Sequence, residues 1–196
     1  MVGVSSPVMS RVRNFANWCN LSTPLGLAVA TLGRARLRRG PEGVWLAEGY
    51  RLGFPMAGAF TIGSVILTAS ASWADLEARH AGLLQHETNH TWQWAYSMGL
   101  AYLPVYGAAM GWSWLRTGDR ASANFFEQSA DLELGGYRVL ATRPLGQGLA
   151  HLRRVISRAA PVARPNGSAD AAHAGGAGAS PTGAGRPARW GRPAVR

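Results

Sequence analysis

Short apolar runs in the first half of the chain predict strands. The runs Ala59-Phe60-Thr61-Ile62 and Val65-Ile66-Leu67-Thr68 flank the pair Gly63-Ser64, which suits a tight hairpin turn. The upstream run at residues 44–52 has the same character and predicts one more strand. We therefore expect a small antiparallel sheet built around a hairpin in this part of the chain.

Helical signals follow the hairpin. Ser72 is a suitable N-cap for a helix from about Trp73 to Met98, which Gly99 would end. Similar signals predict helices at about residues 104–115, 120–134 and 145–159, the second of them stopped by the pair Gly135-Gly136. Strands followed by helices predict an α+β fold.

Three stretches carry no charged residue, at positions 14–33, 52–74 and 91–115. Each is long enough to span a bilayer, but asparagine, proline, glycine and hydroxyl side chains interrupt all three. The third, from Thr91 to Leu115, is rich in tryptophan and tyrosine, so membrane association through it stays open. The apolar run that follows Arg11 and Arg13 is short and broken, which makes secretion an unlikely fate. We expect a cytoplasmic or membrane-associated protein.

The length of 196 residues fits one domain with a real core. We place this domain at residues 10–158. Residues 159–196 consist mainly of Ala, Gly, Pro, Ser and Arg, a composition that buries too little apolar surface to offset its chain entropy. We therefore expect residues 159–196 to form a disordered tail.

The formal net charge is +10, and every basic residue is arginine. The arginines are scattered apart from those at positions 34–39, which we interpret as a solvated loop, and no recognition module for nucleic acid is visible. We expect no nucleic-acid partner. Cys19 is the only cysteine, which excludes an intramolecular disulfide and a CxxC metal or redox site.

The central motif is His86-Glu87-Thr88-Asn89-His90, an H-E-x-x-H sequence within a predicted helix. The i, i+4 spacing puts both imidazoles on one face, where they can bind the same metal ion. Glu87 is rotated by about 100° around the helix axis from His86, so it can reach a water on the metal without being a ligand.

A catalytic zinc ion usually takes three protein ligands, so the third must come from another element. Glu127 and Asp131 form an E-x-x-x-D pair in the later predicted helix, again one turn apart on one face. Glu127 can enter the coordination shell. Asp131 can accept a hydrogen bond from the far nitrogen of a ligand histidine and so fix its tautomer.

Together the two motifs resemble those of the gluzincin zinc metallopeptidases, a group that includes thermolysin and the membrane-bound peptidases of the CAAX-protease type. The run from His90 to Gln93 is also similar to small bacterial zincin-like proteins. The resemblance implies a zincin-like domain with His86, His90 and Glu127 as Zn²⁺ ligands, Glu87 as the general base and Asp131 as the outer partner. It also implies hydrolysis of a peptide or protein substrate, laid along an edge strand.

Two further functions fit the same residues. One is a zincin-like binding or scaffold module that keeps the ligands without turnover. The other is a membrane-embedded zinc protein in which Thr91 to Leu115 enters the bilayer. The nearest candidates for a transition-state donor are Tyr137 and Arg138. His80, two turns before Glu87, is expected to be exposed. The sequence leaves the substrate and the oligomeric state open.

Overall fold

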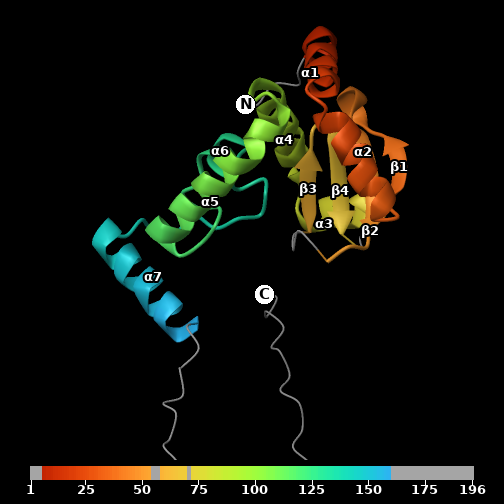
Figure 1. Ribbon diagram of the computed structural model, residues 1–196. Coiled ribbons are helices and arrows are strands. Elements are labelled where there is room, and N and C mark those ends of the chain that lie inside the picture. The colour runs from red at the N-terminus through yellow and green to blue at the C-terminus, as the bar shows by residue number, and fades with distance from the viewer. Residues whose placement is uncertain (1–5, 54–57, 70–71, 160–196) are drawn as a thin grey trace, which may run out of the picture. The chain divides into compact units, whose positions relative to one another are not determined.

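The computed structural model describes residues 6–53, 58–69 and 72–159. Its elements form an α+β fold with seven α-helices and a mixed four-stranded sheet (Figure 1). In the described part of the chain, no helix combines the length and apolar character needed to cross a membrane. The elements are α1 (Pro7–Cys19), α2 (Ser22–Leu32), β1 (Arg36–Arg39), the short 3₁₀ helix η1 (Pro41–Gly43), β2 (Trp45–Tyr50), β3 (Ala59–Ile62), β4 (Val65–Ala69), α3 (Trp73–Arg79), α4 (Leu83–Tyr96), the 3₁₀ helix η2 (Gly99–Ala101), α5 (Tyr102–Thr117), α6 (Phe125–Ser129) and α7 (Leu145–Ala159).

The predicted hairpin is confirmed, but the sheet around it is mixed and not antiparallel. Strands β3 and β4 pair antiparallel across the turn at Gly63, whose φ of 61° favours glycine. The strand order is β1-β2-β4-β3. The second strand of the hairpin therefore lies between β2 and β3, and β4 runs parallel to β2. The run of apolar residues does not encode this pairing.

Helices cover both faces of the sheet. Successive residues of β2 and β4 point to opposite faces. Leu46 and Ile66 pack with Trp73, Leu76 and other apolar residues of α3 and the start of α4. Their neighbours in sequence Ala47, Val65 and Leu67 pack instead against α2. A third cluster, made by Trp94, Tyr102 and Phe126, joins α4, α5 and α6 beside the end of β3.

The long helix predicted from Trp73 to Met98 is two helices. Ser72 caps α3 as expected, because its hydroxyl accepts the Asp75 N–H at 3.1 Å. The chain then breaks at Gly82, whose φ is 91°. The Glu77 carboxylate accepts the N–H groups of Gly82 and Leu84 at 2.6 and 3.1 Å, so it satisfies donors at the start of α4. His80 lies at this break and is exposed, as predicted.

The helix predicted at residues 120–134 is only α6. Asn124 caps its start by accepting the Phe126 N–H at 3.0 Å, and Asp131 has a φ of 74°, outside the helical region. Glu127 and Asp131 are therefore not one helical turn apart on a shared face. The prediction was wrong because local side-chain acceptors, among them Asp119 and Asn124, hold the preceding residues in turns.

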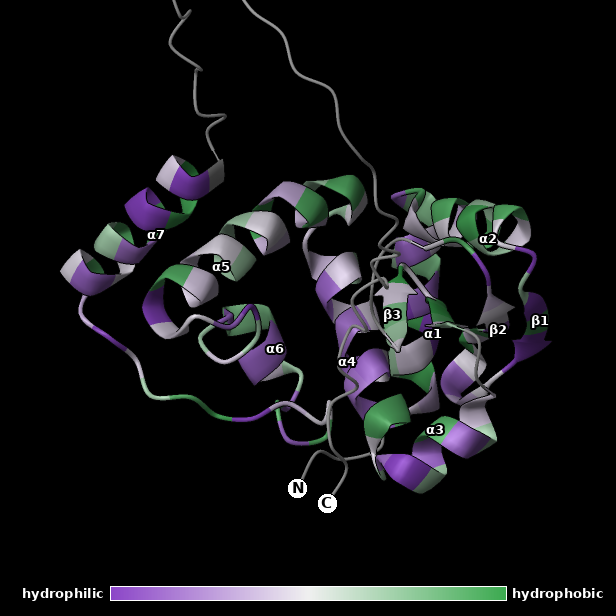
Figure 2. Ribbon diagram, turned by 90° about the horizontal axis from the view of Figure 1, so that it is seen from below, coloured by the Kyte–Doolittle hydropathy of each residue, from purple (hydrophilic) through white to green (hydrophobic). Residues whose placement is uncertain are grey.

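The N-terminal region holds two helices that the sequence did not predict, α1 and α2. The arginines after α2 also differ from the prediction, because Arg36–Arg39 form the edge strand β1, drawn as hydrophilic in Figure 2, and not a loop. The Arg39 guanidinium stacks 3.6 Å from the centre of the Trp45 ring on the neighbouring strand. The expected disordered tail lies almost entirely outside the described residues.

Candidate metal centre

His86 and His90 lie one turn apart on the buried face of α4, and only 1% and 7% of their surfaces are exposed. Their Nε2 atoms are 3.1 Å apart. The i, i+4 geometry inferred from the motif is thus present, with both rings directed at one point.

The outer nitrogen of each ring faces an oxygen acceptor. His86 Nδ1 lies 2.8 Å from the carbonyl oxygen of Asp131, and His90 Nδ1 lies 2.7 Å from Gln93 Oε1. The orientation of the Gln93 amide is fixed, because its Nε2 donates to the carbonyl oxygen of Phe126 at 2.7 Å. Both rings therefore carry their proton on Nδ1 when neutral and present a lone pair at Nε2.

Glu127 brings a third electron-rich atom to the same place. Its Oε2 lies 3.3 Å from His86 Nε2 and 3.7 Å from His90 Nε2, is buried, and has no hydrogen-bond partner. Three lone-pair atoms held this close repel one another unless a cation or a proton lies among them. His86, His90 and Glu127 are thus a buried cluster that can hold a metal ion.

The electrostatics of the metal-free cluster agree with this geometry. Burial opposes ionisation of Glu127, but the imidazoles of His86 and His90 beside it and the hydrogen bond from the Tyr106 hydroxyl outweigh burial and keep the pKa of Glu127 well below its usual range. Burial disfavours the charged form of His90 and so lowers its pKa, but the adjacent Glu127 carboxylate and the charge of Glu87 raise it overall to about 8. Without metal, the cluster therefore holds a proton at neutral pH.

Glu87 is buried but is not one of the converging ligands. Its Oε2 accepts a hydrogen bond of 2.7 Å from the hydroxyl of Thr61 on β3. Its negative charge raises the pKa of His90, which places the carboxylate within electrostatic range of the cluster. The structure thus places Glu87 between the metal centre and the edge strand of the sheet.

The role expected for the Asp131 side chain falls to its main chain. The carbonyl oxygen of Asp131, and not its carboxylate, faces His86 Nδ1. The carboxylate instead accepts the Leu134 N–H at 3.3 Å. The left-handed conformation of Asp131 turns its carbonyl group toward the histidine, and Asp is among the residues that tolerate this conformation.

Sequence reasoning missed Gln93, Tyr102 and Tyr106 as partners of the ligands. The Tyr102 hydroxyl donates to Gln93 Oε1 at 3.0 Å, and the Tyr106 hydroxyl donates to Glu127 Oε1. Tyr106 follows Tyr102 by four residues on the inner side of α5, and this spacing of two tyrosines in a charge-free stretch was the available signal.

Gly135 approaches the ligand side of His86. A Cβ atom on Gly135 would lie 2.8 Å from His86 Nε2, so any side chain there would crowd the nitrogen that faces the cluster. Tyr137 follows, with its ring centre 5.8 Å from that of His86 and 42% of its surface exposed. Burial and the charges of Glu127 and Glu87 raise the pKa of the Tyr137 hydroxyl. Tyr137 therefore lies beside the cluster and reaches solvent.

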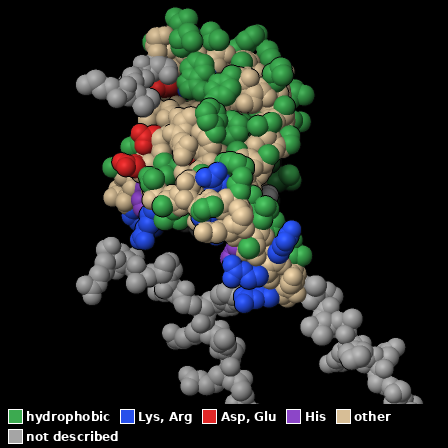
Figure 3. Space-filling model, turned by 90° about the vertical axis from the view of Figure 1, so that its left-hand side faces the viewer, with side chains coloured by type: hydrophobic (Ala, Val, Ile, Leu, Met, Phe, Trp, Pro, Cys, Tyr) green, Lys and Arg blue, Asp and Glu red, His purple; other side chains and the backbone are tan. Residues whose placement is uncertain are grey.

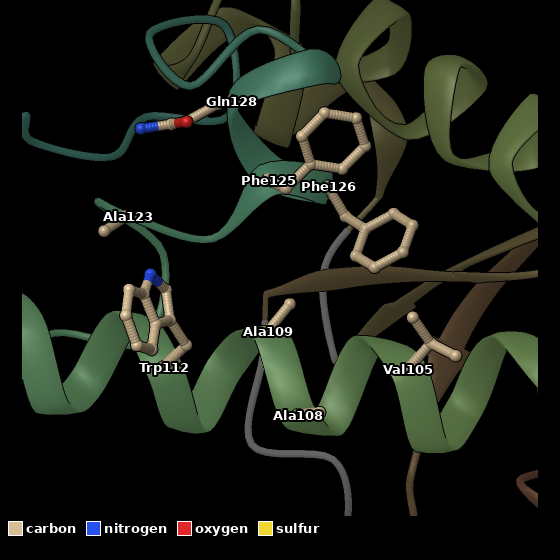
Figure 4. A pocket seen from close by; sticks show the side chains of 8 residues that line it. All are labelled: Val105, Ala108, Ala109, Trp112, Ala123, Phe125, Phe126 and Gln128. Atoms are coloured by element: carbon tan, nitrogen blue, oxygen red, sulfur yellow. The ribbon is translucent and has the colours of Figure 1, made fainter.

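An apolar hollow lies between α5 and α6, apart from the ligands (Figure 4). His86, His90 and Glu127 do not line this hollow, whereas Phe126, the neighbour of Glu127 in the sequence, does. The hollow therefore does not define the metal centre. Its walls are Val105, Ala108, Ala109, Trp112, Ala123, Phe125, Phe126 and Gln128.

Comparison with protein-family models, with curated proteins and with solved structures finds no match to this chain. Its chemistry is therefore inferred from the arrangement of its own residues.

Proposed function

We propose that the protein is a zinc-dependent peptide hydrolase with His86, His90 and Glu127 as the metal ligands. The donor set of two imidazoles and one carboxylate is typical of catalytic zinc. Ligand atoms 2.0–2.1 Å from a tetrahedral zinc ion lie about 3.3–3.4 Å apart. The separations of 3.1, 3.3 and 3.7 Å in this cluster bracket that value. The observation that carries the proposal is this convergence, together with the unpartnered oxygen of Glu127.

The number of ligands favours catalysis over a structural site. Structural zinc sites are usually closed by four protein ligands, most often with cysteine among them. Here three His, Asp, Glu or Cys side chains of the described residues converge, and the only cysteine, Cys19, is exposed. A fourth position is then left for water or substrate.

Glu87 is proposed as the general base. A bound zinc ion would lower the pKa of its water ligand and polarise the scissile carbonyl group. Glu87 takes the proton from the attacking water and delivers it to the nitrogen of the leaving amine. The Thr61 hydroxyl, which donates to the Glu87 carboxylate, would orient it for this transfer.

The edge strand β3 supports an extended peptide as the substrate. It ends the strand order of the sheet, contacts α4 and carries Thr61 beside Glu87. An extended chain can pair with such an edge through backbone groups other than the Thr61 carbonyl, which already accepts the Trp94 indole N–H at 2.9 Å. Tyr137, whose ring lies beside that of His86, is the candidate for stabilising negative charge on the carbonyl oxygen.

The proposal is tested by assaying zinc-loaded wild-type protein and the Glu87→Gln variant on a peptide library. Turnover should fall by about 10²-fold or more in Glu87→Gln, because an amide does not accept the proton at neutral pH. The Thr61→Val variant keeps the Glu87 carboxylate and removes its hydrogen-bond donor, so its turnover should fall by much less. Equal turnover by wild type and Glu87→Gln would refute the mechanism.

One observation favours a second function, a metal-binding module without turnover. The Glu87 carboxylate is buried and already engaged by Thr61 in the metal-free protein. In that case wild type should bind zinc yet cleave no member of the library, and Thr61→Val, which frees the carboxylate, should not create activity.

A further inference from the structure

Helix α1 has the reverse of the usual amphipathic arrangement. Its inner face is polar, with Ser10, Arg13 and Asn17 buried. Its outer face is apolar, with Val12 and Phe15 exposed by 54% and 72%. A helix of a water-soluble protein normally turns its apolar stripe toward the core.

The buried polar side chains of α1 are satisfied within the fold, so this orientation is a stable one. Arg13 pairs with Glu42 at 2.9 Å. Asn17 donates to Ser64 Oγ at 3.1 Å and to the carbonyl oxygen of Thr91 at 2.9 Å. Rotating α1 to turn its apolar stripe inward would break these hydrogen bonds and offer no comparable ones in their place. The outer stripe therefore has no partner within the described chain.

The exposed apolar surface continues from α1 onto the connection between α4 and α5. The two segments touch, because Asn20, which follows α1, donates to the carbonyl oxygen of Trp94 at 3.2 Å and lies against Gly99. We name this the outer apolar surface, and Figure 3 shows hydrophobic side chains gathered over the upper part of one face of the molecule. Its exposed members are Val8, Val12, Phe15, Trp18, Leu21, Tyr96, Met98, Leu100 and Leu103.

The charge of these segments favours an anionic partner. There is no Asp or Glu before Glu42, and none between Glu87 and Asp119. Arg11 on α1 is exposed. A second copy of the chain offers no acidic side chain of these segments to pair with Arg11, whereas anionic lipid headgroups complement this charge. Tryptophan and tyrosine, both present here, are enriched where apolar and aqueous phases meet.

We propose that the outer apolar surface seats the protein on an anionic lipid bilayer, with α1 lying in the interface and not crossing it. Helix α1 has 13 residues, which gives a length of about 20 Å against about 30 Å for the hydrocarbon core. This binding mode buries an apolar helix face at the level of the headgroups. The inference does not depend on the metal centre or on hydrolysis.

Cys19 gives a direct probe, because it is the only cysteine, is exposed, and lies one turn after Phe15 on α1. The full chain is labelled at Cys19 with a polarity-sensitive fluorophore and mixed with vesicles of phosphatidylcholine alone or with phosphatidylglycerol. At equal lipid concentration, we expect the emission to shift to shorter wavelength by more with the vesicles that contain phosphatidylglycerol. The control carries the label at Val139→Cys in a Cys19→Ser background. Val139 is 71% exposed, lies outside this surface, and should report no shift.

Flotation of unlabelled protein with the same vesicles tests the surface by substitution. Phe15→Glu and Met98→Glu should each weaken partitioning by about tenfold or more, and Val139→Glu should leave it unchanged. All three sites are exposed, so equal melting temperatures are expected. The proposal is overturned if wild type fails to float with either vesicle, or if the control variant weakens binding equally. It is also overturned if light scattering shows a wild-type dimer that Phe15→Glu dissociates while vesicle binding is absent.

Discussion

Replacing Gln93 by Met tests whether the buried amide positions the second histidine for metal. Gln93 is 2% exposed, accepts from His90 and Tyr102, and donates to the Phe126 carbonyl and to Ser129 Oγ. Methionine has nearly the same volume but makes none of these four contacts. The Phe126 carbonyl keeps the Ser129 hydroxyl as a donor at 3.1 Å, so the groups that lose their acceptor are His90 Nδ1 and the Tyr102 hydroxyl, which lie 3.5 Å from each other.

A buried donor without an acceptor costs about 1–3 kcal/mol, so the metal-free variant should lose up to about 6 kcal/mol of unfolding free energy, and less where the Tyr102 oxygen accepts from His90 Nδ1. Loss of the acceptor also frees the tautomer and the ring orientation of His90. Removing such an outer partner typically lowers metal affinity by about 10–100-fold. Zinc affinity is measured by competition with a chromogenic chelator, and stability by urea unfolding in EDTA.

A matched control lies on the same helix. Gln85→Met removes a hydrogen bond of 3.0 Å to Asn89 and no contact to either histidine, so zinc affinity should be unchanged. Gln93→Glu keeps an acceptor for His90 and loses only the amide donor, so it should bind zinc far better than Gln93→Met. Equal zinc affinities for Gln93→Met and Gln85→Met would refute the positioning role of Gln93.

Three further results are expected. The pKa of His90 is raised to about 8 without metal, so its protonation stabilises the fold fully below about pH 6.5, and this contribution is lost as pH rises through 8. Zinc must displace the proton, so zinc affinity should fall about tenfold for each pH unit below 8. A titration against a chelator in which affinity begins to fall only near pH 6.5 would contradict the raised pKa. Asp131→Asn should change zinc affinity by less than about threefold in the same competition assay, because the main-chain carbonyl contacts His86, and a loss of the 10–100-fold size typical of outer partners would show that the carboxylate is needed. Gly135→Ala should lower zinc affinity, because the new methyl group would crowd His86 Nε2. Gly146→Ala on α7 is the control, since nothing lies within 4 Å of its new methyl group. Equal zinc affinities of the two variants by isothermal titration would show that the loop moves aside.

Part of the candidate site could be predicted because His86 and His90 are close together in the sequence. The i, i+4 spacing of His86 and His90 fixes their relation within one helix, and the structure brings them together with Glu127, which 36 residues separate from His90. The strand hairpin was predictable for the same reason, since a two-residue turn between apolar runs is a short-range signal.

The remaining features depend on tertiary contacts. Which oxygen faces His86 is decided by the left-handed conformation of Asp131, which its residue type permits but does not require. The insertion of β4 beside β2 depends on where the intervening connection crosses. Helix α1 was missed because its buried face is polar, so the usual apolar periodicity is turned outward.

Equilibrium dialysis of wild type, Glu87→Gln and Glu127→Gln against buffered zinc, followed by metal analysis, tests the central claim most directly. The account predicts about one zinc ion per chain in wild type and in Glu87→Gln, because Glu87 lies outside the converging atoms. Glu127→Gln should be nearly empty at the same free zinc, because it replaces the carboxylate whose Oε2 lies 3.3 and 3.7 Å from the Nε2 atoms of His86 and His90. Wild type without zinc, or full zinc in Glu127→Gln together with an empty Glu87→Gln, would contradict it.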